Sequence, residues 1–374
     1  MFKKENKIVE KEKIFMASQW QLIRWKFFSH KMAVAGSMVL LIFYIIATFC
    51  EFLSPNDPRK RYIAYINAPP QRIHVIDTAG KFHFRPFIYP ITMSRDPITL
   101  RERFIINQEQ PLPIYFFVRG TEYKMWGMFS GSRHLFGTGI PEKPVYLLGA
   151  DKVGRCLLSR IFYGSRISLT IGLLGIGISF LLGITIGGIS GYYGGWVDRI
   201  IQRVIEFIMG IPSLPLWMGL SAALPPYWPM VKIYFGIIII LSLIGWTSLA
   251  RVVRGKFMAL REEDFVMAAR LDGAGTGRVI FKYLLPSFYS HIIAIMTLAI
   301  PGMILGETAL SFIGLGLQSP AISWGVLLKD AQNIPAIAFT PWLLSPALFI
   351  LIVVLSFNFV GDGLRDAADP YSRV

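Results

Sequence analysis

The chain has 374 residues, of which 53% are hydrophobic and 16% are charged. Soluble domains carry roughly 25% charged residues, so this composition indicates that lipid is the solvent and argues against a soluble globular protein. The net charge of +15 would indicate nucleic-acid binding in a soluble protein. In a membrane protein Lys and Arg gather in cytoplasmic loops, and the positions of these charges along the chain favour that explanation.

The first apolar stretch follows a polar and basic segment. Residues 1–31 are rich in Lys, and the apolar run at 32–52 is too long for the hydrophobic region of a signal peptide. We therefore expect a cytoplasmic N-terminal segment at 1–31 and a retained first transmembrane helix at 32–52.

A long segment, 53–166, separates the first apolar stretch from the second. It alternates apolar and polar residues at 72–76 and 81–84 on either side of a Gly-containing turn, and 113–118 has strand character as well. We predict a small β-containing extracytoplasmic insert with a lead-in to the second helix. Its content of Phe and Tyr argues against the alternative, a partly ordered loop.

A helix needs roughly 20 apolar residues to span a bilayer, and further stretches of this length follow the insert. They lie at 167–190, 201–224, 233–250, 291–313 and 342–360. We therefore predict an all-α polytopic membrane protein with six transmembrane helices and a membrane core at 167–361. Glycines recur every four residues at Gly183, Gly187, Gly191 and Gly195, a spacing that lets two helix backbones approach closely.

The basic residues of the short connections lie mainly between the fourth and fifth spans. They are Arg251, Arg254, Lys256, Arg261, Arg270, Arg278 and Lys282. If the N-terminus is cytoplasmic, every basic short connection is cytoplasmic too, and so is the C-terminal tail at 362–374.

The cytoplasmic segment 251–289 carries the most informative pattern. Acidic residues at 262–264 begin a predicted short helix, where they suit the positive end of the helix dipole, and Gly273 ends it. A second short helix is expected next, with Pro286 leading into the fifth span. Two short helices fixed to two spans are suited to transmit force from a soluble partner.

This segment resembles the coupling loop, or EAA motif, of ABC importer permeases. The residues at its positions are Met267, Ala268, Ala269, Arg270, Asp272, Gly273, Leu285 and Pro286. Met267 stands where the family usually has glutamate. The resemblance implies that the loop contacts a cytosolic ATPase.

Other segments resemble, in order, the motifs of the C-type subunit of the dipeptide, oligopeptide and nickel importer family. They are LGADKVGR at 148–155, YGSRISL at 163–169, GYYGGWVD at 191–198, ETALSFIGLG at 307–316, SWG at 323–325 and NFVGDGLRD at 358–366. Ala150 and Cys156 replace the usual Thr and Asp. The motif residues that we expect to be structural are Gly149, Asp151, Gly154, Arg155, Gly164, Arg166, Gly191, Gly194, Gly195, Asp198, Glu307, Ser311, Gly314, Gly316, Trp324, Gly325, Asp362, Gly363, Arg365 and Asp366.

The resemblance implies a type I ABC importer permease fold, in a subunit that forms half of the translocation pathway for peptides across the bacterial cytoplasmic (inner) membrane. It also implies a second permease subunit, two cytosolic ABC ATPases and an extracytoplasmic solute-binding protein as partners. ATP and Mg would bind to the ATPases, so this chain is expected to hold no cofactor and to be no enzyme. Nickel complexes or oligosaccharides remain alternative solutes. A stand-alone secondary transporter is disfavoured because such proteins tend to show internal repeats and charges at mid-membrane.

Several chemical functions are not supported by the sequence. A phosphate-binding loop would need Ser or Thr after Gly255-Lys256, where this chain has Phe257. We expect His74 and His83 on facing strands, but a pair without a third ligand argues against a metal site. Cys50 and Cys156 suit apolar packing, with a disulfide between them left open. Glu307 is ionisable within a span and is left open between a functional role and internal pairing.

Overall fold

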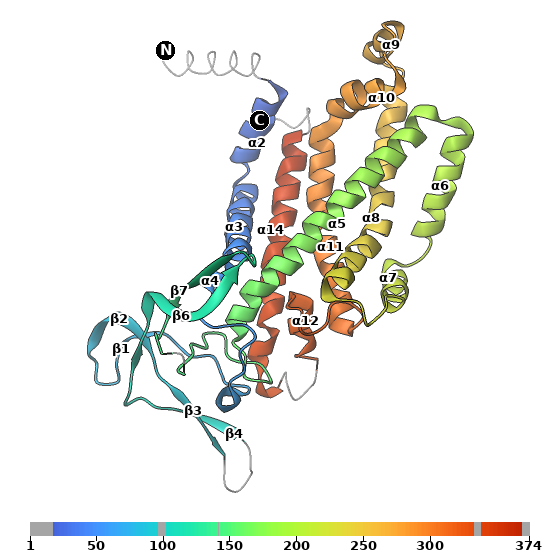
Figure 1. Ribbon diagram of the computed structural model, residues 1–374. Coiled ribbons are helices and arrows are strands. Elements are labelled where there is room, and N and C mark those ends of the chain that lie inside the picture. Colours follow the sequence, from blue (N-terminus) through green and yellow to red (C-terminus); the bar gives the residue numbers. More distant parts are fainter. Residues whose placement is uncertain (1–17, 96–101, 141, 333–337, 369–374) are drawn as a thin grey trace, which may run out of the picture.

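Long apolar helices lie side by side as a bundle, and a smaller part built of strands lies at one end of it (Figure 1). The computed structural model describes residues 18–95, 102–140, 142–332 and 338–368. The helices are α2 (Gln19–Ser29), α3 (Lys31–Thr48), α4 (Cys50–Leu53), α5 (Leu157–Tyr193), α6 (Gly195–Met209), α7 (Ser213–Ala222), α8 (Met230–Leu260), α9 (Asp264–Leu271), α10 (Thr276–Arg278), α11 (Tyr289–Ile313), α12 (Trp324–Lys329) and α14 (Ser345–Ala368).

Five of the predicted spans are confirmed as helical segments. Among the described residues, five segments are long and apolar enough to cross a membrane. They are Lys31–Thr48, Leu157–Tyr193, Met230–Leu260, Thr276–Ile313 and Pro341–Ala368. Most are longer than predicted because helical structure continues past the apolar stretch into polar residues.

The predicted third span, 201–224, is not one helix. Its residues belong to α6 and α7, which are bent by 85° at a short break. The break falls at Gly210 and Pro212, where glycine weakens a helix and proline has no N–H to continue it. The six-span count therefore holds only when this bent pair is taken as one span.

The core of the bundle lies between α3, α5, α8, α11 and α14. Each contributes fully or almost fully buried apolar side chains, among them Phe43, Leu169, Leu241, Ile304 and Val353. The close contact of α5 with α8 uses the predicted glycines. A Cβ on Gly183 would lie 2.9 Å from Leu249, and one on Gly187 or Gly191 would collide with the α8 backbone at Ala250 or Arg254.

The fourth glycine of that series has a different role. Gly195 meets nothing within 4 Å, and its φ of +56° places it in the turn between α5 and α6. The spacing therefore predicted helix contact correctly for three positions and wrongly for Gly195.

The insert between α4 and α5 consists of three small antiparallel sheets. The strands are β1 (His74–Ile76), β2 (Phe82–Ile88), β3 (Ile91–Arg95), β4 (Glu102–Ile106), β5 (Leu112–Pro113), β6 (Tyr115–Met125) and β7 (Phe129–Gly137). They pair as β1-β2-β5, β3-β4 and β6-β7. The predicted hairpin and the predicted strand near 113–118 are thus confirmed as β1–β2 and β5–β6.

The expected pairing of His74 with His83 is wrong. The register places His74 opposite Phe87, and the ring of His83 lies 2.9 Å from the Asp77 carboxylate instead. The hydrogen bond from His83, with those from the N–H groups of Lys81 and Ala79, lowers the pKa of Asp77. Asp77 therefore organises the turn as a carboxylate.

The two ends of the bundle differ, and we name them by what they carry. The α9 end holds α9, α2, the turn between α5 and α6, and the described end of α14 (Figure 1). The insert end holds the strands and α12. Both cysteines, Cys50 and Cys156, lie near the insert end, buried and free, so no disulfide joins them.

We predict that Gly187→Leu destabilises the protein. The added side chain must displace the α8 backbone at Ala250, and overpacking of this kind costs about 1–3 kcal/mol or more. Gly177→Leu is the matched control, because a Cβ at Gly177 on the same helix meets nothing within 4 Å. Thermal unfolding in detergent should give a lower melting temperature for Gly187→Leu alone, and equal melting temperatures would contradict the contact.

Candidate functional site

Helix α9 projects from the end of the bundle on the connection between α8 and α11 (Figure 1). Asp264 lies in its first turn and Arg270 in its last, which suits the helix dipole. Val266 and Ala269 form its buried face. Val266 packs into a cluster with Val279, Ile280 and, from α8, Phe257.

The end of α9 depends on Gly273. This residue has φ +78°, and its N–H donates to the carbonyl of Arg270, while the N–H of Ala274 donates to the carbonyl of Ala269. These two bonds are the Schellman motif, which needs a left-handed residue after the helix cap. The predicted helix stop is confirmed, with Asp272 as the cap residue.

Several apolar side chains of α9 are exposed in the described chain. Leu271 is 89% exposed, Met267 51% and Phe265 41%, and Ala268 is exposed beside them. Arg270 on the same helix is held with its guanidinium 5.0 Å from the ring centre of Tyr192. We name Phe265, Met267, Ala268 and Leu271 the α9 patch.

The predicted second short helix is not separate. Thr276–Ile313 is one continuous helical segment, with a π-helical turn at Val279–Leu284 and a 3₁₀ turn at Leu285–Phe288 before α11. Leu285 is buried, and Pro286 sits in the 3₁₀ turn, where its missing N–H is tolerated. The segment that α9 contacts therefore continues directly into the fifth span.

Beside α9, a carboxylate joins α5, α6 and α8. Asp198 accepts hydrogen bonds from Arg254 at 2.5 and 2.6 Å and from the Ser190 hydroxyl at 2.5 Å. The turn that places Asp198 there contains Gly194 and Gly195, both with positive φ. The GYYGGWVD segment is thus a turn that places the carboxylate of Asp198 at the contact between α5 and α8.

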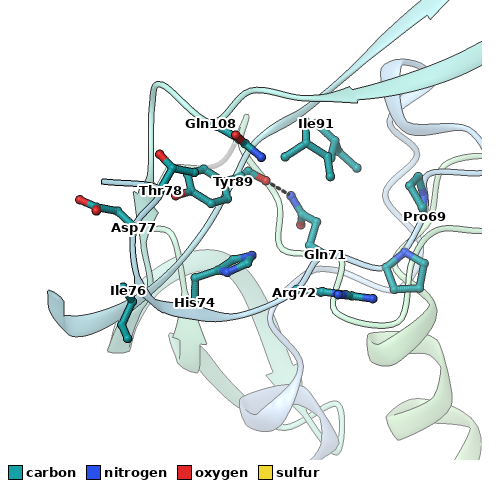
Figure 2. Close-up of a pocket in the computed structure, with 12 residues that line it drawn as sticks. Pro69, Gln71, Arg72, His74, Ile76, Asp77, Thr78, Tyr89, Ile91 and Gln108 are labelled. Carbon is teal, nitrogen blue, oxygen red and sulfur yellow. Dashed lines mark hydrogen bonds between the residues drawn. The ribbon is translucent and has the colours of Figure 1, made fainter. Parts of the chain in front are cut away.

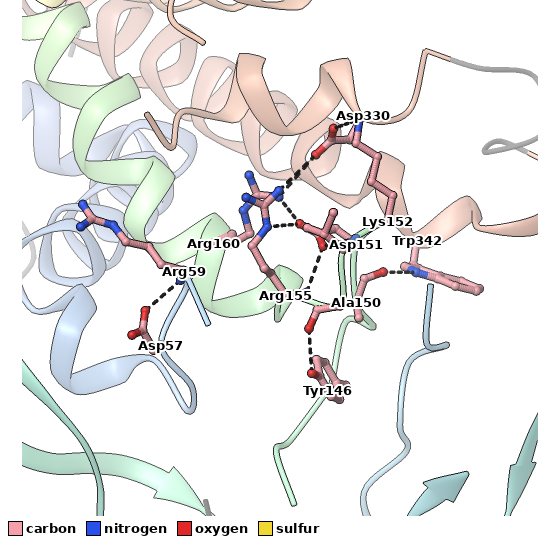
Figure 3. A network of polar contacts seen from close by, with 12 residues as sticks. Asp57, Arg59, Tyr146, Ala150, Asp151, Lys152, Arg155, Arg160, Asp330 and Trp342 are labelled. Atoms are coloured by element: carbon pink, nitrogen blue, oxygen red, sulfur yellow. Dashed lines mark hydrogen bonds and ion pairs between the residues drawn. The ribbon is translucent and has the colours of Figure 1, made fainter. Parts of the chain in front are cut away.

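At the insert end, a buried ionic network joins the loop before α5 to α12 (Figure 3). Asp151 and Arg160, which are 0% and 1% exposed, form an ion pair. Arg155 donates to Asp151 at 2.7 Å. Asp330 at the end of α12 lies 2.7 Å from Lys152 and 3.4 Å from Arg160.

Backbone geometry supports this network. Gly149 and Gly154 have φ values of +78° and +77°, and a Cβ on either would collide with the segment that precedes the strands, at Ala68 or Tyr62. The carboxylate of Asp151 also accepts the N–H groups of Val153 and Arg155. The LGADKVGR segment is therefore a tight turn around one buried acid.

Arg166 ties α5 to the end of the first span. It forms a bidentate ion pair with Glu51 at 2.6 and 2.7 Å and donates to the carbonyls of Ala47 and Thr48 at 2.8 and 2.9 Å. Such paired geometry is the strong form of an Arg–carboxylate contact.

Glu307 is fully buried in α11 and has internal partners. It accepts hydrogen bonds from Ser311 and Ser323, both at 2.7 Å. Trp324 follows Ser323 and is also fully buried, donating its Nε1–H to the carbonyl of Ile161. Of the two readings left open for Glu307, these contacts favour internal pairing.

The remaining motif glycines lie around these groups. Gly325 faces Thr308 and Gly316 faces Ser311, each without room for a side chain, and Gly164 lies in a tight contact with Trp324. Gly314 has φ +93° and ends α11.

The C-terminal motif brings α14 against the first helices. Gly363 lies against Ala33, where a Cβ would collide, and Asp366 lies 4.0 Å from His30. Asp362 and Arg365 are exposed at the α9 end.

Sequence reasoning missed the partners of these motif residues. The pairs are Arg160 with Asp330, Asp198 with Arg254, Arg166 with Glu51, and Glu307 with Ser323. A signal existed for Glu51 alone, since a carboxylate at the end of an apolar stretch needs a partner.

The described residues contain no group of three or more His, Cys, Asp or Glu that could hold a metal ion. Hollows lie in and beside the insert. One, of about 530 Å³, lies within the insert beside β1, with Arg72, His74 and Tyr89 in its wall (Figure 2). Another, of about 480 Å³, lies where the insert meets the bundle and reaches Arg166 and Met230.

Comparison with known proteins gives a consistent result. The family described as "Binding-protein-dependent transport system inner membrane component" matches residues 183–374, and the "N-terminal TM domain of oligopeptide transport permease C" matches residues 18–70. The dipeptide transport system permease protein DppC of Bacillus subtilis is 40% identical over 63% of this chain and 71% of its own length.

Two further relatives carry oligopeptide names. The oligopeptide transport system permease protein OppC of Bacillus subtilis is 38% identical over 64% of this chain and 76% of its length. OppC of Haemophilus influenzae is 37% identical over 69% of this chain and 79% of its length.

We predict that Asp151→Ala strongly destabilises the protein. The buried guanidinium of Arg160 would lose its nearest carboxylate, and breaking a buried pair costs about 3–5 kcal/mol. Glu262→Ala is the control, because its pair with Arg261 is largely exposed and contributes about 1 kcal/mol at most. A melting temperature of Asp151→Ala as high as that of the control would show that the network contributes nothing.

Proposed function

Because the chain belongs to the family of binding-protein-dependent transport system inner membrane components, we propose that it forms half of a translocation pathway for peptides in an ABC importer. The names of the relatives support peptides as the solute, since they are dipeptide and oligopeptide permeases.

The observation that carries the proposal is the exposed α9 patch on a helix that is packed against the start of the fifth span. Exposed apolar side chains on a helix that projects from the membrane bundle are the kind of surface that binds a partner protein. On the buried side of α9, Val266 is packed against a segment that continues into the fifth span. A partner that moves α9 therefore moves α11 as well.

We assign the α9 end to the cytoplasm. The basic residues Arg254, Arg261, Arg270 and Arg278 lie on or beside α9, and cytoplasmic connections carry the excess of Lys and Arg. Both termini then belong to the cytoplasmic side of the inner membrane, and the insert lies outside. The insert is suited to dock the extracytoplasmic solute-binding protein.

The partners follow from this arrangement. A second permease subunit completes the pathway, and two cytosolic ABC ATPases hold ATP and Mg and perform the hydrolysis. The α9 patch is the docking site of one ATPase, with Met267 at the position of the usual glutamate. This chain acts by shifting between two conformations of the bundle, which needs differential contact with the ATPases rather than a catalytic group.

A pull-down from native membrane in mild detergent, followed by mass spectrometry, tests the assembly. Recovery of a second permease and of ATPases is expected. Recovery of this chain alone would refute the proposed partners.

We predict that Gly273→Val uncouples transport from ATP hydrolysis. Valine is strained at φ +78°, so the end of α9 must rearrange although the site itself has room for the side chain. Peptide uptake into proteoliposomes should fall severalfold while the assembled complex still hydrolyses ATP. Gly275→Val is the matched control, since Gly275 has φ −67° and nothing within 4 Å. Unchanged uptake by Gly273→Val would count against the coupling role.

We also predict that Leu271→Asp weakens binding of the ATPase. Leu271 is the most exposed residue of the α9 patch, and loss of a central apolar anchor typically costs about 2 kcal/mol of binding free energy. Glu263→Ala, an exposed change at the start of the same helix, should have little effect. Co-purification of the ATPase at wild-type level with Leu271→Asp would place the contact elsewhere.

A further inference from the structure

The β6–β7 hairpin has an unusual turn. Its two central residues, Trp126 and Gly127, have φ values of +52° and +77°, and the N–H of Met128 donates to the carbonyl of Met125. This is the pattern of a type I′ turn, which favours Asn or Gly at both central positions. A bulky indole at the first of them is strained, and such strain is kept where the side chain has a function.

The turn reaches back along the bundle to the end of the first span. The Trp126 indole N–H donates to the carbonyl of Thr48, the last residue of α3, at 2.9 Å. Its backbone N–H lies 3.3 Å from the Glu51 carboxylate, and its ring centre is 6.5 Å from that of Phe49. Figure 1 shows the tip of the hairpin beside α4 and the lower end of α3.

The tip exposes apolar side chains at this level. Met128 is 71% exposed, Phe129 61% and Trp126 48%. The ring of Trp126 also touches that of Phe129, with ring centres 6.4 Å apart. Immediately behind the tip, Lys124 and Ser130 are polar and exposed.

One face of α3, which ends beside the hairpin tip, is apolar and exposed along the helix. Met38, Leu41, Ile42, Ile45 and Phe49 form a stripe at helical spacing, each between 41% and 63% exposed. In a candidate membrane span such a stripe faces lipid. Because the ring of Trp126 lies beside that of Phe49 at the end of this stripe, the hairpin tip continues the lipid-facing surface.

We propose that the tip of the β6–β7 hairpin inserts into the interfacial region of the bilayer at the insert end of the bundle, with phospholipid as its partner. Trp and other aromatic side chains favour the level of the lipid headgroups, where the ring is apolar and the N–H is bonded. Lys124, one position behind the turn, lies where it meets headgroup phosphate. The hairpin thereby holds the insert against the membrane surface.

Quenching of a probe on the tip tests this proposal. Met128→Cys in the full chain, within its complex in phospholipid nanodiscs, accepts a fluorescent label selectively because Cys50 and Cys156 are buried. Ala79→Cys, in the exposed β1–β2 turn of the same insert, is the control position. We expect nitroxide-labelled lipid with a shallow label to reduce the fluorescence at 128 and not at 79, and aqueous iodide to do the reverse.

Two results would overturn the proposal. Quenching at 128 by iodide as strongly as at 79 would mean that the tip lies in water. Protection of 128 from both quenchers would mean that a protein covers it.

A second variant tests the indole itself. Trp126→Asn removes the ring at a position whose backbone conformation suits Asn, so the hairpin is retained. We expect the label at 128 to lose lipid quenching and gain iodide quenching. Unchanged quenching by lipid would show that Trp126 does not anchor the tip.

Discussion

The close approach of α5 to α8 is the constraint on which the rest of the bundle depends. Gly187 and Gly191 leave no room for a side chain between the two backbones, so the helices meet at a fixed register. Asp198 then fixes the rotation of that contact, because it reaches from the start of α6 to Arg254 on α8 and Ser190 on α5. In lipid there is little apolar driving force between helices, so close packing and polar bonds must set their arrangement.

The same logic applies at the insert end, where charges are buried rather than exposed. Asp151 and Arg160 form a buried ion pair, and Asp330 supplies a second carboxylate from the end of α12. Glu51 and Arg166 join the end of the first span to α5 in the same way. Ion pairs thus tie the elements of the insert end together, whereas α9 projects from the other end of the bundle.

Much of the fold could be predicted from the sequence because lipid imposes a simple rule on segment length. The first, second and fourth to sixth spans were found from apolar runs, and the β1–β2 hairpin from alternation and its turn. The break in the third span was missed because mostly apolar residues continue on both sides of it, at the end of α6 and in α7. Gly210 and Pro212 were visible, but membrane helices tolerate such residues, so they did not decide the matter.

The site was predictable in its local parts and not in its pairings. The helix stop at Gly273 follows from conformation alone, whereas spacing does not reveal that Thr276–Ile313 continues as one helical segment. Asp330 lies 170 positions from Arg160, and Arg254 lies 56 positions from Asp198, so no local pattern could identify these two partners.

The separation of Arg160 from Asp330 also bears on how the chain is made. The two residues lie 170 positions apart, so at ribosomal rates roughly 10–30 seconds pass between their synthesis. During that interval Arg160 has Asp151 beside it but lacks Asp330, and α12 has not yet closed over the turn that holds it. The ionic network at the insert end is therefore completed late in translation, after α5 and most of the other helices have been synthesised.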